Sequence, residues 1–289
     1  MRKPFSEGVS RFDAGAKLGG LLLLAGLVAL YVGVVPSMVH DWGTDENYSH
    51  GYLIPFIAAY LLWAQRDAIR EVAGRARGSW VGLVVCVGSL AMLVVGRAGA
   101  ELFLQRSSLV FLLIGLVLWL WGWGMLRLTG GPLAFLLFMV PLPYLIYDAV
   151  AFPLKLFAAR VATQSLYWLH IPVYREGNII HLASQTLEVA DACSGIRSLI
   201  SLIALGVIYA WLTERVRWKQ FVIAFFTVPI AIAANAFRVA GTGILAHHVG
   251  PEAAQGFFHT FSGWLVFVVA FVLLLGVGGA LKLAGRRGG

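Results

Sequence analysis

Charge is scarce in this chain. Asp, Glu, Lys and Arg make up only 12% of its 289 residues, whereas hydrophobic residues make up 60%. Soluble globular domains carry about 25% charged residues, so this composition excludes an ordinary water-soluble enzyme or binding module. The chain is predicted to be a multi-pass membrane protein.

Cysteine is almost as rare, with only Cys86 and Cys193 in the whole sequence. Two cysteines in a chain of this length exclude a disulfide framework. Cys86 lies within the apolar run "GLVVCVGSL", where a small packed residue is the simplest interpretation. Internal repeats, low-complexity segments and a separate soluble domain are also missing, which predicts one membrane domain over residues 1–289.

Long apolar runs are what the sequence has in abundance. About 20 apolar residues in a helix cross a hydrocarbon core of ~30 Å. The predicted fold class is therefore all-α, with about eight transmembrane helices at residues 18–37, 51–65, 79–96, 107–126, 131–149, 194–213, 220–246 and 260–281.

The basic residues predict the orientation of these helices, because Lys and Arg gather in cytoplasmic loops. Fifteen fall on the side of the two tails, so both termini are expected in the cytoplasm. Five fall on the opposite side: Arg97, Arg106, Lys155, Arg160 and Arg175. The outer face then receives residues 40–51, 150–192 and 247–260. Within 150–192 we expect an interfacial helix over about 150–170, followed by a short hairpin at a Gly-Asn pair.

Three chemically reactive side chains are predicted at one depth. Counted from the basic residue at the cytoplasmic end of its helix, each of Cys193, Arg238 and His259 lies about 28–35 Å away at 1.5 Å per residue. All three therefore reach the outer boundary of a core of ~30 Å, on three consecutive helices. They can converge on one site.

Cys193 has neighbours that favour a reactive thiolate. It stands in "VADACSGIRSL" at a predicted helix N-terminus, where free N–H groups stabilise an anion, and Arg197 follows one turn later. An isolated cysteine at a helix start is usually only a small packed residue, so the interpretation depends on these neighbours. Asp191 or Ser194 can cap the same helix.

Arg238 and His259 each keep a second interpretation. A charged side chain within a span costs a few kcal/mol unless it faces water or a partner, so Arg238 either serves a site or snorkels to the outer headgroups. Asn235, three residues earlier, can orient it from the same helix face. His259 can be an ordinary interfacial histidine. His247 and His248 lack further ligands at a recognisable spacing, so no metal site is predicted.

Two other outer segments can support the site. We expect Ser49 and His50 to lie behind it, with capping and interfacial anchoring as the alternative. Pro141 and Pro143 break a helix at similar depth, and non-helical backbone there requires protein or a water-filled cleft around it. Such a cleft can admit an extended peptide.

Together these residues form a minimal set for acyl transfer that needs no cofactor. Cys193 is the expected nucleophile, His259 the general acid or base, and Arg238 the donor to an oxyanion. Which group deprotonates the thiol stays open, because Arg197 can already hold it as a thiolate.

The chain resembles the exosortase/archaeosortase family of membrane-embedded cysteine transpeptidases. The resemblance rests on "ACSGIRSL" (192–199), "NAFRVAGTG" (235–243) and "FHTFSGW" (258–264), with further matches in "NYSHGYLIP" (47–55), "FMVPLP" (138–143) and "YREGNII" (174–180). It implies a triad of Cys193, Arg238 and His259.

The resemblance also implies the partners and the location. Substrates would be exported proteins with a C-terminal sorting signal, made of a Pro-Glu-Pro motif, a transmembrane helix and a basic cluster. The enzyme would lie in a bacterial inner membrane, in contact with lipid, with its active site facing the periplasm or exterior. It would pass the acyl group to an unidentified acceptor nucleophile. No nucleic acid is expected as a partner.

Two alternative functions stay open. A non-catalytic permease or assembly component for exopolysaccharide export would be expected to place polar groups near mid-membrane and often to contain inverted repeats, and neither is visible in the sequence. A protease that releases its product to water shares the acyl-enzyme with a transpeptidase, so the sequence does not separate the two.

Overall fold

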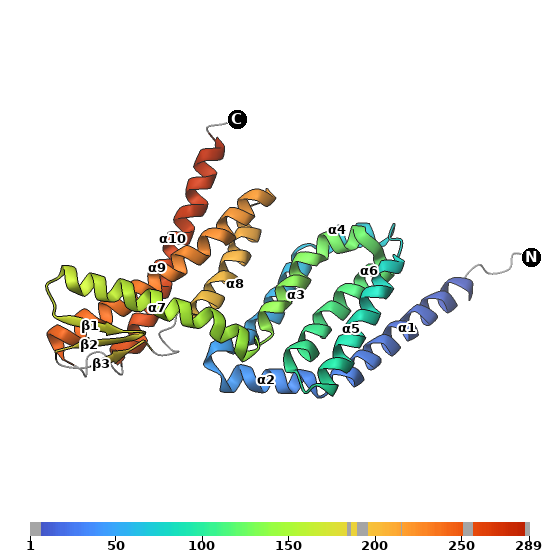
Figure 1. Cartoon of the computed structure of the whole chain (residues 1–289). Helices are drawn as coiled ribbons and strands as arrows, with labels where there is room; N and C mark the ends of the chain where they lie inside the picture. The colour runs from blue at the N-terminus through green and yellow to red at the C-terminus, as the bar shows by residue number, and fades with distance from the viewer. Residues whose placement is uncertain (1–6, 184–185, 190–195, 215, 251–256, 287–289) are drawn as a thin grey trace, which may run out of the picture. The chain divides into compact units, whose positions relative to one another are not determined.

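The computed structural model describes residues 7–183, 186–189, 196–214, 216–250 and 257–286, without the side chains of residues 7–17, 196–198, 246, 257–262 and 284–286. Helices make up most of it (Figure 1), which confirms the expected all-α membrane class. The chain divides into two compact units, Met1–Pro141 and Leu142–Gly289.

Fewer helices than the expected eight are long and apolar enough to cross a membrane. Over the described residues there are four, Trp80–Ala98, Leu102–Met139, Arg217–Val249 and Gly263–Leu283, or five if the bent pair Leu18–Tyr31 and Val34–Thr44 forms one span. The segment expected at 51–65 differs because α3 (Leu53–Ala64) has only 12 residues. Such a helix rises about 18 Å, well short of a core of ~30 Å. The chain is a multi-pass membrane protein, and its eight spans are not confirmed.

The first unit is a group of helices joined by short connections. Besides α3 it contains α1 (Glu7–Tyr31), α2 (Val34–Thr44), the 3-10 helix η1 (Glu46–Tyr52), α4 (Arg66–Ala73), α5 (Trp80–Ala98), α6 (Leu102–Phe135) and the 3-10 helix η2 (Leu136–Met139). Helices α5 and α6 lie close together because Gly115 has no side chain. A Cβ there would lie 2.8 Å from the Cys86 Sγ. Cys86 is buried at this contact, in agreement with a packing role.

The break expected between residues 126 and 131 lies instead at Gly122. This residue has φ 73° and ψ −169° within α6, so the helix consists of two segments on either side of it. Glycine adopts a positive φ without steric strain. A side chain at this position would also collide with the carbonyl oxygen of Arg77. The backbone geometry therefore requires glycine here.

The helix expected over 131–149 is interrupted. The helix η2 ends at Met139, and α7 (Tyr144–Trp168) begins after Pro143, its N-cap. Proline lacks an N–H and moves the residue before it out of the helical region. The break predicted from Pro141 and Pro143 is confirmed.

The second unit places a small sheet against a helix group. It contains α7, the strands β1 (Val173–Glu176), β2 (Ile179–Leu182) and β3 (Thr186–Glu188), and the helices α8 (Ile196–Thr213), α9 (Arg217–Val249) and α10 (Phe257–Arg286).

Two elements of the expected outer insertion 150–192 are present in this unit. The predicted hairpin is confirmed, since β1 pairs antiparallel with β2 around Gly177, whose φ is 61°. The third strand, β3, pairs with the other side of β2 and was not predicted. A helix over 150–170 is also confirmed as part of the longer α7. Its position at the membrane surface stays a prediction.

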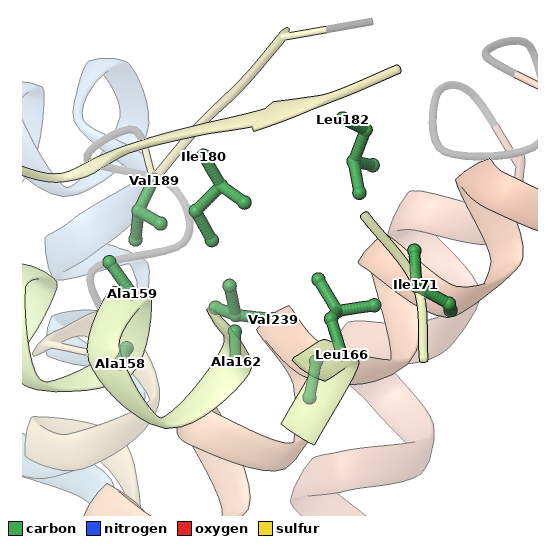
Figure 2. Packing of buried hydrophobic residues seen from close by; sticks show 10 residues of the cluster. Ala158, Ala159, Ala162, Leu166, Ile171, Ile180, Leu182, Val189 and Val239 are labelled. Carbon is green, nitrogen blue, oxygen red and sulfur yellow. The ribbon is translucent and has the colours of Figure 1, made fainter. Parts of the chain in front are cut away.

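One hydrophobic cluster joins the sheet to α7 and α9 (Figure 2). Its ten buried residues are Ala158, Ala159, Ala162, Leu166, Ile171, Ile180, Leu182, Val189, Val239 and Ala240. The alanines of α7 leave little side-chain volume between α7 and α9, so the two backbones can approach closely. The sheet is thereby fixed on the surface that these two helices form.

Helices α8, α9 and α10 pack against one another in successive layers. One layer contains Ala210, Ile223 and Leu274 from the three helices in turn. The next contains Leu199 and Leu202 of α8, Ala231 and Ala234 of α9, and Ala270 of α10. From the first layer to the second, residue numbers decrease on α8 and on α10 but increase on α9. Helix α9 is therefore antiparallel to α8 and α10. The start of α8, the last part of α9 and the start of α10 therefore lie at one end.

Candidate functional site

The predicted site residues differ in how far the structure describes them. Cys193 and Ser194 lie outside the described residues. Arg197 is placed in the first turn of α8 and His259 in the first turn of α10, by their backbones alone. Arg238, on α9, is described with its side chain.

Arg238 lies against the backbone of α10. A Cβ added at Gly263 would be 3.3 Å from the Arg238 Nη2, 3.4 Å from its Cζ and 3.7 Å from its Nη1. The guanidinium group therefore fits next to α10 at the position where that helix has no side chain. This contact joins two of the three helices on which the predicted triad lies.

His259 shares a helix face with this contact. It precedes Gly263 by four residues in α10, and residues four apart lie one above the other on an α-helix. The Arg238 guanidinium therefore lies one turn away from the backbone position of His259. The structure brings these two predicted residues to the same part of the α9 and α10 interface.

Next to Arg238, the backbone of α9 also packs against α7 and the sheet. The next two residues, Val239 and Ala240, belong to the cluster beneath the sheet. Asn235, three residues earlier, is buried with 5% of its surface exposed, and it lies on the Arg238 face of the helix as predicted. Since the neighbours of Arg238 pack on α7 and the sheet, its side chain extends from a fixed backbone.

The strand β3 ends at the segment that leads to Cys193. Val189 is 2% exposed and belongs to the same cluster as Val239. Its N–H donates to the Asn178 carbonyl oxygen at 3.0 Å, and the Asn178 Nδ2 donates to the Val189 carbonyl oxygen at 3.3 Å. Figure 2 shows Val189 and Val239 pointing into one interior. The chain is thus anchored four residues before the predicted nucleophile.

Ser49 and His50 make their contacts within the first unit. Ser49 is exposed, and its hydroxyl donates to the Glu46 carbonyl oxygen at 3.1 Å within η1, whose N-cap is Asp45. His50 Nε2 lies 3.2 Å from the Phe138 carbonyl oxygen and joins η1 to η2. Burial lowers the pKa of His50, although hydrogen bonds to the backbone of Phe138 and Asn47 act in the opposite direction. A supporting role at the predicted site stays a prediction for both.

The sequence interpretation missed the most buried charge among the described residues. Arg106 was expected in a loop on the outer side, but it lies inside α6 and is only 2% exposed. Its Nη2 is 2.7 Å from the Asp41 Oδ2 and donates to the Ser37 Oγ at 2.9 Å. The available signal was Asp41, an acidic residue that closely follows the first apolar run.

Potential metal ligands are few in the described part of the chain. His247 and His248 meet edge to face at the end of α9, with ring centroids 4.9 Å apart. No group of three or more His, Cys, Asp or Glu side chains comes together among the described residues.

Comparison with known proteins gives one result. The family model for the transmembrane exosortase (Exosortase_EpsH) matches residues 42–276. Comparison with curated proteins and with solved structures gave no significant match. The matched range includes Arg238, the Gly263 contact and the segment between β3 and α8. It covers most of the chain, which therefore belongs to the transmembrane exosortase family.

Proposed function

We propose that this chain is a membrane-embedded cysteine transpeptidase, which cleaves the C-terminal sorting signal of exported proteins through an acyl-enzyme on Cys193. Family membership supports a transpeptidase-like role in the membrane. The observation that carries the assignment of residues is the contact of the Arg238 guanidinium with α10, one turn from His259. The contact lies at the end of the three helices where α8 begins.

The layers of the helix group support the convergence of the triad. Leu199, Ala234 and Val266 pack in one cluster on α8, α9 and α10. Arg238 follows this layer by one turn, and His259 lies two turns beyond it. Cys193 is three residues from Ile196, and three residues of extended chain span at most about 11 Å. We propose that the nucleophile comes from this segment, directly before α8.

The proposed reaction begins with transfer of the Cys193 thiol proton, either to His259 or to water, with the thiolate stabilised in the second case by Arg197 and the start of α8. The sulfur attacks the scissile carbonyl carbon, and the carbonyl electron pair moves to oxygen. Arg238 donates hydrogen bonds to this oxyanion. Collapse of the intermediate breaks the C–N bond, the leaving amine takes a proton from His259, and a thioester remains on Cys193.

An acceptor nucleophile then attacks the thioester carbonyl and releases the Cys193 thiol. With an acceptor on the outer face, the reaction is a transpeptidation; with water, it is a hydrolysis. The product mass separates the two, because water and acceptor add different masses.

We also propose the orientation and the organisation of the chain. The distribution of Lys and Arg supports cytoplasmic termini and an active site that faces the periplasm or exterior of a bacterial inner membrane. The family match extends from residue 42 to residue 276 and so includes parts of both compact units. This supports one exosortase domain that needs both units.

Intact-mass analysis tests this function. The protein is purified after co-expression with a reporter that ends in a Pro-Glu-Pro motif, a transmembrane helix and an Arg-rich tail. We expect a covalent adduct on the wild-type protein and no adduct in Cys193→Ala. His259→Ala should form much less adduct than the wild type, because the leaving amine takes its proton from His259. Tail cleavage that persists in Cys193→Ala would disprove the nucleophile assignment. An intact tail with every variant would favour the permease alternative.

A further inference from the structure

We infer that Gly263 is a positioning residue for Arg238, because the missing side chain at this point of α10 sets where the guanidinium group lies. The geometric part of this inference is independent of the reaction. Its consequence for catalysis rests on the proposed function, in which Arg238 stabilises the oxyanion.

A residue with a Cβ fits at position 263 only if the Arg238 guanidinium group moves. A Cβ at Gly263 would lie 3.3 Å from the nearest guanidinium nitrogen. The backbone of α9 cannot easily withdraw, because Val239 and Ala240 pack against α7 and the sheet. The flexible end of the Arg238 side chain is therefore the part that must move, by a few tenths of an ångström.

The other glycines of α10 with described surroundings show that this arrangement is local. A Cβ at Gly276 or Gly279 would meet nothing within 4 Å. A Cβ at Gly278 would collide with the ring of Tyr209 on α8, so that glycine serves helix packing. Among these four glycines, Gly263 is the one that lies against a charged side chain.

Small displacements matter at this position because an oxyanion donor acts through distance and direction. Hydrogen-bond donors stabilise a transition state when they lie about 2.7–3.1 Å from the developing charge. A misplacement of about 1 Å can cost about 100-fold in rate. A shift of a few tenths of an ångström at Arg238 should therefore lower kcat about tenfold.

The experiment compares three alanine substitutions in the full-length protein: Gly263→Ala, Gly276→Ala and Gly278→Ala. Three quantities are measured for each: the unfolding temperature, the rate at which phenylglyoxal modifies Arg238, located by peptide mass, and kcat and KM for reporter cleavage. Gly263→Ala should change the modification rate at least about twofold and lower kcat about tenfold, with KM nearly unchanged, because the oxyanion forms only after binding.

The two controls separate positioning from helix stability. Gly276→Ala should leave all three quantities unchanged, because its Cβ enters open space. Gly278→Ala should lower the unfolding temperature through Tyr209, with kcat per folded molecule unchanged. If Gly263→Ala lowers the unfolding temperature and leaves the Arg238 modification rate at the wild-type value, the inference is wrong.

A double substitution provides the second test. If Gly263 acts through Arg238, Gly263→Ala should have no further effect on kcat in an Arg238→Ala background. An equal loss with and without Arg238 would overturn the inference. Failure of the proposed function has a different signature, namely no cleavage that depends on Cys193. The modification rate of Arg238 still tests the geometric role of Gly263 in that case.

Discussion

Arg106 and Asp41 form a buried ion pair that joins α6 to α2. The Arg106 Nη2 lies 2.7 Å from the Asp41 Oδ2, and the arginine side chain is 3% exposed while the aspartate side chain is 34% exposed. The same guanidinium donates to Ser37, so one buried cation holds two positions of α2. Helices α1 and α2 meet at a bend of 56°. The ion pair holds α2, the helix after this bend, against α6.

Replacement of Asp41 by Ala should destabilise the protein. It leaves the Arg106 charge buried without its carboxylate, and breaking a buried pair costs about 3–5 kcal/mol. Because a third of the Asp41 side chain is exposed, we expect a loss nearer about 2–3 kcal/mol, measured as a lower unfolding temperature in detergent.

The exposed pair of Asp67 and Arg70 provides a control, since its side chains are 79% and 77% exposed. Asp67→Ala should leave the unfolding temperature nearly unchanged. The double variant Asp41→Leu with Arg106→Met should be more stable than Asp41→Ala alone, because it removes the uncompensated charge. Equal effects of Asp41→Ala and Asp67→Ala would contradict this role.

Gly122→Ala should also destabilise the first unit. Gly122 has φ 73°, which is costly for a residue with a Cβ, and its Cβ would collide with the Arg77 carbonyl oxygen. We expect a loss of about 1–3 kcal/mol in the free energy of unfolding. Gly88→Ala on α5 is the matched control, because a Cβ there meets nothing within 4 Å. A Gly122→Ala protein as stable as Gly88→Ala would show that the chain does not need the kink.

His50 should make the stability of the first unit depend on pH. Burial lowers the pKa of His50 below its ordinary value of 6.5, so the unfolded chain binds a proton more readily than the folded chain does. Stability should therefore be complete above about pH 6.5 and should decrease as the pH falls below it. The unfolding temperature at pH 7.5 and pH 5.5 measures this difference.

His50→Gln should reduce this pH dependence, because glutamine can still donate to the Phe138 carbonyl oxygen but does not titrate. His247→Gln, at an exposed position, should keep the wild-type dependence. If His50→Gln and the wild type lose the same number of degrees between the two pH values, another group is responsible.

Arg238→Gln tests the oxyanion assignment. Loss of an oxyanion donor costs about 10²–10³ in kcat, with a smaller effect on KM. Reporter cleavage by purified protein measures both constants. Arg160→Gln, an exposed arginine on α7 in the same unit, is the matched control and should retain wild-type kinetics. An effect on KM alone would assign Arg238 to substrate binding.

The sequence predicted the features that depend on local chemistry. Pro141 and Pro143 define the break before α7, because proline prevents helix continuation whatever surrounds it. The Gly-Asn pair at Gly177 defines the hairpin. The sequence also predicted Arg238 and His259 close together, and the structure brings Arg238 against α10 one turn from the backbone of His259. Their depth in the membrane stays a prediction.

The features that the sequence did not predict depend on partners far along the chain. Arg106 reads as a loop residue at the start of an apolar run, and only Asp41, 65 positions earlier, explains its burial. Gly122 is one of several glycines in a long apolar segment, and its conformation follows from the approach of the Arg77 backbone. Strand β3 is too short to give a clear alternating pattern.

The cluster beneath the sheet has a consequence for biogenesis. The hairpin residue Ile180 packs on α7, which the ribosome makes before it, and in the same cluster as Val239, which lies 59 positions after it. The hairpin and α7 can associate early because they are close in sequence. The remaining side of the cluster is covered only after α9 has been made. We therefore expect the hairpin to reach its final packing in the nascent chain only after Val239 and Ala240 have been made.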